Sequence, residues 1–195
     1  MKKGVFIIHG WDGYPEEGWF PWLKKELESR GFEVQVPAMP EPAVPKIEVW
    51  VSHLSKIVGD VNENTFFVGH SIGCQTILRY LESLPVDKKV GGTVFVSGWF
   101  VLGDLETEEE KIIGRPWIET PINFNLIKGL TNNFVAIFGD NDPVVPFEEN
   151  KKLFEERLNT KIIIEHDKGH FSGSDGVTEL PSALNAVLEM TGGLS

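Results

Sequence analysis

Short apolar or alternating runs are interleaved along the chain with longer stretches in which apolar residues recur every three or four positions. The short runs predict strands, and the second pattern predicts amphipathic helices. The predicted strands span residues 4–10, 32–36, 65–68, 92–97, 134–138 and 161–165. The predicted helices span residues 19–30, 46–60, 72–84, 146–158 and 179–190. This alternation predicts an α/β fold with a mainly parallel sheet and helices on both of its faces.

Residues 98–133 interrupt the alternation. A structureless loop of that length is unusual in a compact domain, so one or two short helices are expected there, forming a small lid-like insertion. The segment carries the acidic run 104–110, which predicts a solvated face or a helix start rather than a metal site. With 195 residues and no visible repeat or linker, the chain is expected to form one domain spanning 1–195.

The composition excludes several classes of partner. A formal net charge of −11 disfavours nucleic acids and anionic membrane surfaces as partners. The single cysteine, Cys74, excludes an internal disulfide and a cysteine-rich zinc site, and is expected to be a small core residue. The apolar run Val5 to Ile8 is too short for a signal-peptide core or a membrane span, so a soluble, cytoplasmic protein is expected.

The third predicted strand leads directly into the pattern G-x-S-x-G at residues 69–73. A serine on a sharp turn between a strand and a helix is held in strained backbone geometry that projects its hydroxyl. The following helix directs its positive end and the Ile72 amide toward the place where an oxyanion would form. Ser71 is therefore the candidate nucleophile.

Two other strands end in loops that carry the remaining groups a nucleophilic serine needs. Asp140 and Asp142 follow the fifth strand, and His170 follows the sixth. Parallel strands deliver their carboxyl ends to one edge of the sheet, and the order Ser, Asp, His is that of an α/β-hydrolase. Asp140 and Asp142 compete for the carboxylate role, and Asp142 is preferred because it lies further into the loop.

Further residues are candidates for the pocket. Trp11 follows Gly10 at the end of the first strand, so its amide can serve as the second oxyanion donor, and its indole as a pocket wall. We expect substrate contacts from Trp11, His70, Trp99 and Phe171. The aromatic residues Trp99, Phe100 and Trp117 fit either a pocket lining or the core. His9, His53, His70 and His166 lack metal-ligand spacing, so no metal site is expected.

Over its whole length the sequence resembles an α/β-hydrolase. More narrowly, it is similar to the small serine hydrolases that include the retinoblastoma-binding serine hydrolases and their bacterial relatives. The resemblance is carried by His9-Gly10-Trp11 and by residues 69–73, 139–146 and 169–171. It implies a nearly lidless α/β-hydrolase with esterase or related acyl-hydrolase activity. We predict six parallel strands in the order 2-1-3-4-5-6, and no cofactor is expected. The resemblance also implies that Ser71 is the nucleophile, Asp142 the orienting acid and His170 the base. The amides of Trp11 and Ile72 would then donate to the oxyanion.

These observations predict a serine hydrolase that cleaves a small ester-type substrate through an acyl-enzyme. Two alternatives stay open: a thioesterase or aminopeptidase-like amidase with the same residues, and a binding or scaffolding protein without useful catalysis. A missing hydrogen bond between Ser71 and His170 would favour the last of these, although the geometry of a free enzyme can be loose. The sequence indicates neither the acyl chain nor a protein partner.

Overall fold

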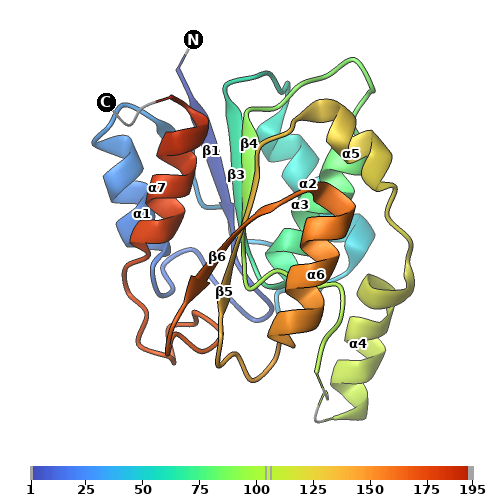
Figure 1. Cartoon of the computed structure of the whole chain (residues 1–195). Helices are drawn as coiled ribbons and strands as arrows, with labels where there is room; N and C mark the ends of the chain where they lie inside the picture. Colours follow the sequence, from blue (N-terminus) through green and yellow to red (C-terminus); the bar gives the residue numbers. More distant parts are fainter. Residues whose placement is uncertain (1, 104, 106, 193–195) are drawn as a thin grey trace.

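Six parallel strands form one twisted sheet at the centre of the molecule (Figure 1). The computed structural model describes residues 2–103, 105 and 107–192. Each strand pairs in parallel with its neighbours, in the order β2-β1-β3-β4-β5-β6. The strands are β1 (Gly4–Ile8), β2 (Glu33–Gln35), β3 (Thr65–His70), β4 (Gly92–Val96), β5 (Phe134–Gly139) and β6 (Lys161–Glu165). The predicted α/β class and strand order are confirmed.

Helices cover both faces of the sheet, as the alternation along the chain predicts. Helices α1 (Phe20–Glu28) and α7 (Pro181–Met190) lie on one face. The other face carries α2 (Ile47–Val58), α3 (Ile72–Glu82), α5 (Phe124–Leu130) and α6 (Phe147–Leu158) (Figure 1). Within the residues described, no helix has the length and hydropathy required to cross a membrane.

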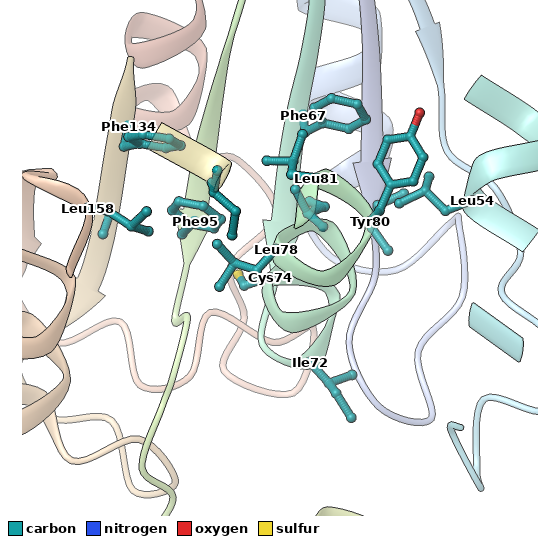
Figure 2. Packing of buried hydrophobic residues seen from close by; sticks show 14 of the residues in the cluster. Leu54, Phe67, Ile72, Cys74, Leu78, Tyr80, Leu81, Phe95, Phe134 and Leu158 are labelled. Carbon is teal, nitrogen blue, oxygen red and sulfur yellow. The ribbon is translucent and has the colours of Figure 1, made fainter. Parts of the chain in front are cut away.

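The sheet separates two hydrophobic cores because successive strand side chains point to opposite faces. Phe66 and Val68 of β3 pack in the core beneath α1 and α7, whereas Phe67 packs in the core beneath α2 and α3. Helix α3 lies deepest, with every residue except Glu82 buried. Figure 2 shows its side chains against the strands, among them Cys74, which is buried as expected. Burial raises the pKa of this thiol, so it stays protonated and unreactive.

The insertion 98–133 contains two helices, α4 (Glu108–Glu119) and α5. The acidic run begins α4, where Thr107 and Glu110 form a reciprocal capping box and three glutamates complement the helix dipole. Residues 104 and 106 of that run lie outside the described residues. Helix α5 buries Ile127 and Leu130 in the core against α3, so it belongs to the helical layer.

One buried amide fixes the start of the insertion. Asn150 of α6 is fully buried, and its Oδ1 accepts hydrogen bonds from the amides of Phe100 (2.7 Å) and Val101 (3.0 Å). Its Nδ2 donates to the carbonyls of Val101 (2.8 Å) and Pro146 (2.9 Å). The side chain therefore has the hydrogen bonds that its burial requires, and it joins the segment after β4 to α6.

Candidate active site

Ser71 occupies the turn between β3 and α3. Its backbone has φ +52° and ψ −122°, a conformation that side-chain-bearing residues seldom adopt and that costs roughly 1–3 kcal/mol. The Ser71 amide donates to the Val96 carbonyl (2.9 Å), which fixes the turn to β4. The residue is 8% exposed. The strained turn predicted from G-x-S-x-G is therefore present.

The two glycines of the motif are required by close packing. A Cβ on Gly69 would lie 2.8 Å from the Cys74 amide nitrogen, and one on Gly73 would lie 2.4 Å from the Ile8 carbonyl oxygen. Both distances are shorter than a Cβ contact allows. Helix α3 thus approaches β1 and β3 so closely that only glycine fits on either side of Ser71.

The amides of Trp11 and Ile72 are free to donate. In the part of the chain that the structure describes, neither N–H has an acceptor, and both residues line the same cavity as Ser71. Ile72 is the first residue of α3, where backbone amides have no partner within the helix. The Trp11 indole donates to the Ala43 carbonyl (2.9 Å), which holds the ring in place.

Asp142 and His170 form a largely buried pair in the loops that follow β5 and β6. His170 Nδ1 lies 2.8 Å from Asp142 Oδ2, and the two side chains are 16% and 2% exposed. Asp142 Oδ1 accepts from the amides of Val144 (2.9 Å) and Val145 (3.0 Å). Burial acts to raise the pKa of Asp142, but the hydrogen bonds and the neighbouring imidazole outweigh it and hold the pKa below its usual value.

A second hydroxyl also reaches Asp142. Ser97 Oγ donates to Asp142 Oδ2 at 2.8 Å, from a fully buried residue with φ +43°. Both carboxylate oxygens are therefore fixed by hydrogen bonds.

Asp140, the competing carboxylate, faces a different histidine. Its Oδ2 lies 2.6 Å from His166 Nδ1, and its Oδ1 accepts from the Asp167 amide at 3.3 Å. This exposed pair raises the pKa of His166 and lowers that of Asp140 through their hydrogen bond. The structure thus brings Asp142, and not Asp140, to His170.

Both backbone groups of His170, its amide and its carbonyl, form hydrogen bonds. The His170 amide donates to Asp175 Oδ2 (3.1 Å), and the His170 carbonyl accepts from His70 Nε2 (2.7 Å). His70 belongs to the serine turn, so one side chain joins the Ser71 turn directly to the His170 loop. The carbonyl of Phe171 accepts from the buried Trp19 indole (3.1 Å).

Ser71 and His170 line one cavity of about 160 Å³. Among the predicted substrate contacts, Trp11, His70 and Trp99 line it as well. Its other lining residues are Gly10, Glu17, Ile72, Leu102, Leu105, Val144 and Ser172. A more open cavity of about 620 Å³ adjoins it. Three residues line both cavities, namely Trp11, Leu105 and Val144.

The expectation for Phe171 is wrong. Its side chain is 1% exposed and packs in the core beneath α1 and α7, away from the cavity. The reason is local, because a backbone φ of +57° turns the chain directly after His170. Phe100 and Trp117 are buried and do not line this cavity either.

Within the described residues, Ser71 Oγ makes no hydrogen bond to His170 or to any other group. Such contacts are often long or poorly aligned in free enzymes and close only when substrate binds. The described residues also contain no group of three or more His, Cys, Asp or Glu side chains placed to hold a metal ion.

Comparison with known proteins decides the family. The sequence model of the family described as serine hydrolase matches residues 5–189. The chain belongs to the serine hydrolase family. The YdeN hydrolase of Bacillus subtilis strain 168 is 35% identical over 182 residues, which cover 93% of this chain and 92% of that protein. The serine hydrolase RBBP9 of Rattus norvegicus is 28% identical over 162 residues, 81% of this chain and 80% of that protein.

Solved structures of other proteins are similar to this chain over most of its length. The crystal structure of the ydeN gene product has a TM-score of 0.89 at 31% identity, covering 98% of this chain and all of that one. Est1E from Butyrivibrio proteoclasticus has a TM-score of 0.73 at 15% identity, over 98% of this chain and 89% of its own, and shows the shared fold alone. The predicted resemblance to small serine hydrolases is confirmed.

Two residues of this serine hydrolase site, Ser97 and Asp175, were not predicted from the sequence. The hydrogen bond by which His70 joins the Ser71 turn to the His170 loop was not predicted either. Ser97 and Asp175 are short polar residues in loops, where such residues are common and follow no periodicity. A signal existed only for Ser97, which is the last residue of the fourth predicted strand, at the edge where the site forms.

The buried histidines make the stability of the fold depend on pH. Burial lowers the pKa of His70 to about 3, and the His170 imidazole acts in the same direction. Burial also lowers the pKa of His9, whose Nε2 accepts from the Met39 amide at 3.0 Å only while unprotonated. In the unfolded chain these imidazoles titrate near the ordinary value of about 6.5. Below that pH the unfolded chain therefore binds more protons than the folded chain.

We expect His70 to lower the free energy of unfolding by about 1.4 kcal/mol per pH unit as the pH drops below about 6, and His9 to act in the same direction. Urea unfolding between pH 6 and 4.5 measures this slope, and His70→Gln should reduce it by about one proton. His166→Gln is the control, because the pKa of His166 is raised in the folded chain. His166 is therefore largely protonated in both the folded and the unfolded chain over this pH range. An unchanged slope in His70→Gln would show that His70 is not held neutral.

Proposed function

We propose that this serine hydrolase cleaves small carboxylic esters through an acyl-enzyme formed on Ser71. Ser71 Oγ attacks the substrate carbonyl carbon while its proton passes to His170 Nε2. The His170 imidazolium then protonates the leaving alkoxide. Water attacks the acyl-enzyme with His170 again taking the proton, which releases the carboxylic acid and restores Ser71.

The observation that carries the proposal is the hydrogen-bonded Asp142–His170 pair in one cavity with the strained Ser71 turn. Asp142 accepts the Nδ1 proton of His170, so the neutral ring keeps Nε2 free to act as a base. The free amides of Trp11 and Ile72 are suited to stabilise the oxyanion of the tetrahedral intermediate.

The dimensions of the cavity favour a small acyl group. About 160 Å³ is below the range of about 300–1,000 Å³ found for drug-sized ligands. A long acyl chain would have to continue past Trp11, Leu105 and Val144 into the more open cavity. We therefore expect short-chain p-nitrophenyl esters to have a higher kcat/KM than long-chain ones.

A panel of p-nitrophenyl esters of graded chain length, with matched thioester and anilide substrates, tests this proposal. Faster thioester or anilide cleavage at matched acyl groups would instead indicate a thioesterase or an amidase with the same residues. A fluorophosphonate probe separates an enzyme from a catalytically idle binding protein. Failure of Ser71 to be labelled under conditions that label other serine hydrolases would count against the acyl-enzyme.

A further inference from the structure

A second cavity, open to solvent on one side, lies among the helices α3, α4, α5 and α6. It has a volume of about 320 Å³ and shares no lining residue with the cavity of Ser71. Its walls come from α3, from the segment after β4, from the end of α4 and from α5 and α6. The lining residues that matter here are Gln75, Arg79, Phe100, Trp117, Phe124 and Arg157.

Arg79 brings to this cavity a buried positive charge that has no carboxylate in direct contact. The residue is 6% exposed, and its Nη2 donates to the carbonyls of Trp117 (2.8 Å) and Thr120 (3.0 Å). Its buried Nε has no acceptor among the residues described. Glu48 and Glu82 act on Arg79 only through space, since no ion pair joins it to a described carboxylate. A buried guanidinium without an anionic partner is costly, so an anion at this place would be stabilised.

Arg157 of α6 supplies a second guanidinium to the same cavity. Its guanidinium carbon lies 4.7 Å from the centroid of the Phe100 ring and 5.2 Å from that of Phe124, so two cation–π contacts hold it at the cavity wall. In the described part of the chain it too has no carboxylate within ion-pair distance. Two oriented guanidinium groups without acid partners are unusual in a chain of net charge −11. Planar guanidinium groups match the geometry of carboxylates.

Gln75 adds an acceptor that lacks a donor. It precedes Arg79 by one helical turn and is 1% exposed. Its Nε2 donates to the Trp99 carbonyl, whereas its buried Oε1 has no partner among the described residues. A ligand that completes this cavity must therefore accept hydrogen bonds from the guanidinium groups and donate one to an amide oxygen. A water molecule can do both, but it leaves the two guanidinium groups without an anion in direct contact.

We propose that this cavity binds a small carboxylate that also carries a hydroxyl group. The carboxylate would lie between Arg79 and Arg157, its short carbon chain would contact the aromatic walls, and its hydroxyl would donate to Gln75 Oε1. Because Arg79 also holds the carbonyl groups at the end of α4, the bound acid would stabilise the attachment of α4 to α3. The proposal does not depend on the chemistry of Ser71.

Calorimetric titration and thermal unfolding of the full chain with lactate, propionate and inorganic phosphate test the proposal. Lactate should bind with a Kd in the millimolar range and raise Tm by several degrees at saturation, and propionate should bind more weakly. Arg157→Gln should weaken lactate binding at least tenfold. Lys152→Gln, the same change of charge on an exposed residue of α6, should leave it within twofold.

Three results would overturn the proposal: no saturable lactate binding in the millimolar range, phosphate binding as tightly as lactate, or lactate binding that Arg157→Gln leaves unchanged. The last result would place the acid elsewhere, for example at Ser71 as a product. Gln75→Leu gives an independent check, because it should remove the preference for lactate over propionate. An unchanged preference would contradict the role of the hydroxyl group.

Discussion

Replacing Ser71 with alanine is expected to lower kcat/KM for a short-chain p-nitrophenyl ester by roughly 10³-fold or more. The reason is that no acyl-enzyme can form without the hydroxyl, and only the oxyanion donors and substrate binding would remain to assist attack by water. The fold should be unaffected, because Ser71 Oγ makes no hydrogen bond within the described residues and alanine tolerates the turn as well as serine does. Steady-state rates and Tm of both proteins check this.

Ser52→Ala is a matched control, since this serine is exposed on α2 and far in sequence from the site. It should retain the wild-type rate. A pre-steady-state burst of p-nitrophenol in the wild type, absent from Ser71→Ala, would identify the acyl-enzyme directly. If Ser71→Ala retained more than about a tenth of the activity, well outside the loss expected for a nucleophile, another residue would have to be the nucleophile.

The parts of the site that could be predicted are those tied to the strands. Ser71, Asp142 and His170 each follow a strand whose apolar run is visible in the sequence, and parallel strands bring their carboxyl ends to one edge. The parallel strand arrangement therefore predicts that these loops lie together, and this prediction needs no information on side-chain contacts. The same argument placed the Trp11 amide beside Ser71, because β1 and β3 are adjacent.

The parts that escaped prediction depend on backbone conformation within loops. Phe171 follows the base in sequence but turns into the core because its φ is positive, and no residue-type rule predicts a positive φ for phenylalanine. Asn150 acts through hydrogen bonds to a distant backbone segment, and Asp175 through a hydrogen bond to the His170 amide inside its own loop. Asn150 lies at helical spacing with Phe154 and Leu158 on the buried face of α6, but a single sequence does not show that an asparagine there bonds to the segment after β4.

The loop between β5 and α6 provides a test of which carboxylate acts, because it carries Asp140 and Asp142 two residues apart. Asp142→Asn is expected to lower kcat about 10³- to 10⁴-fold with little loss of stability. In the variant, the amide oxygen should stay on the Oδ1 side, where the amides of Val144 and Val145 donate. The amide nitrogen then faces His170 Nδ1 and Ser97 Oγ.

This orientation reverses the hydrogen bond to the base. An NH₂ group at the Oδ2 position donates to His170 Nδ1, so the ring proton moves to Nε2, the nitrogen that should accept the Ser71 proton. Ser97 Oγ can accept the remaining N–H, which is why the fold is expected to persist. The loss would therefore arise from the wrong tautomer rather than from unfolding, and Tm measured beside kcat separates the two causes.

Asp140→Asn is the matched control, since it removes the same charge two residues away in the same loop. Its carboxylate contacts the exposed His166 and the Asp167 amide, so the activity should change by only a few-fold. Equal losses in both variants would show that the charge or shape of the loop matters, and not the contact with His170. A large loss in Asp142→Asn alone would instead assign the orienting role to the carboxylate that lies 2.8 Å from the imidazole.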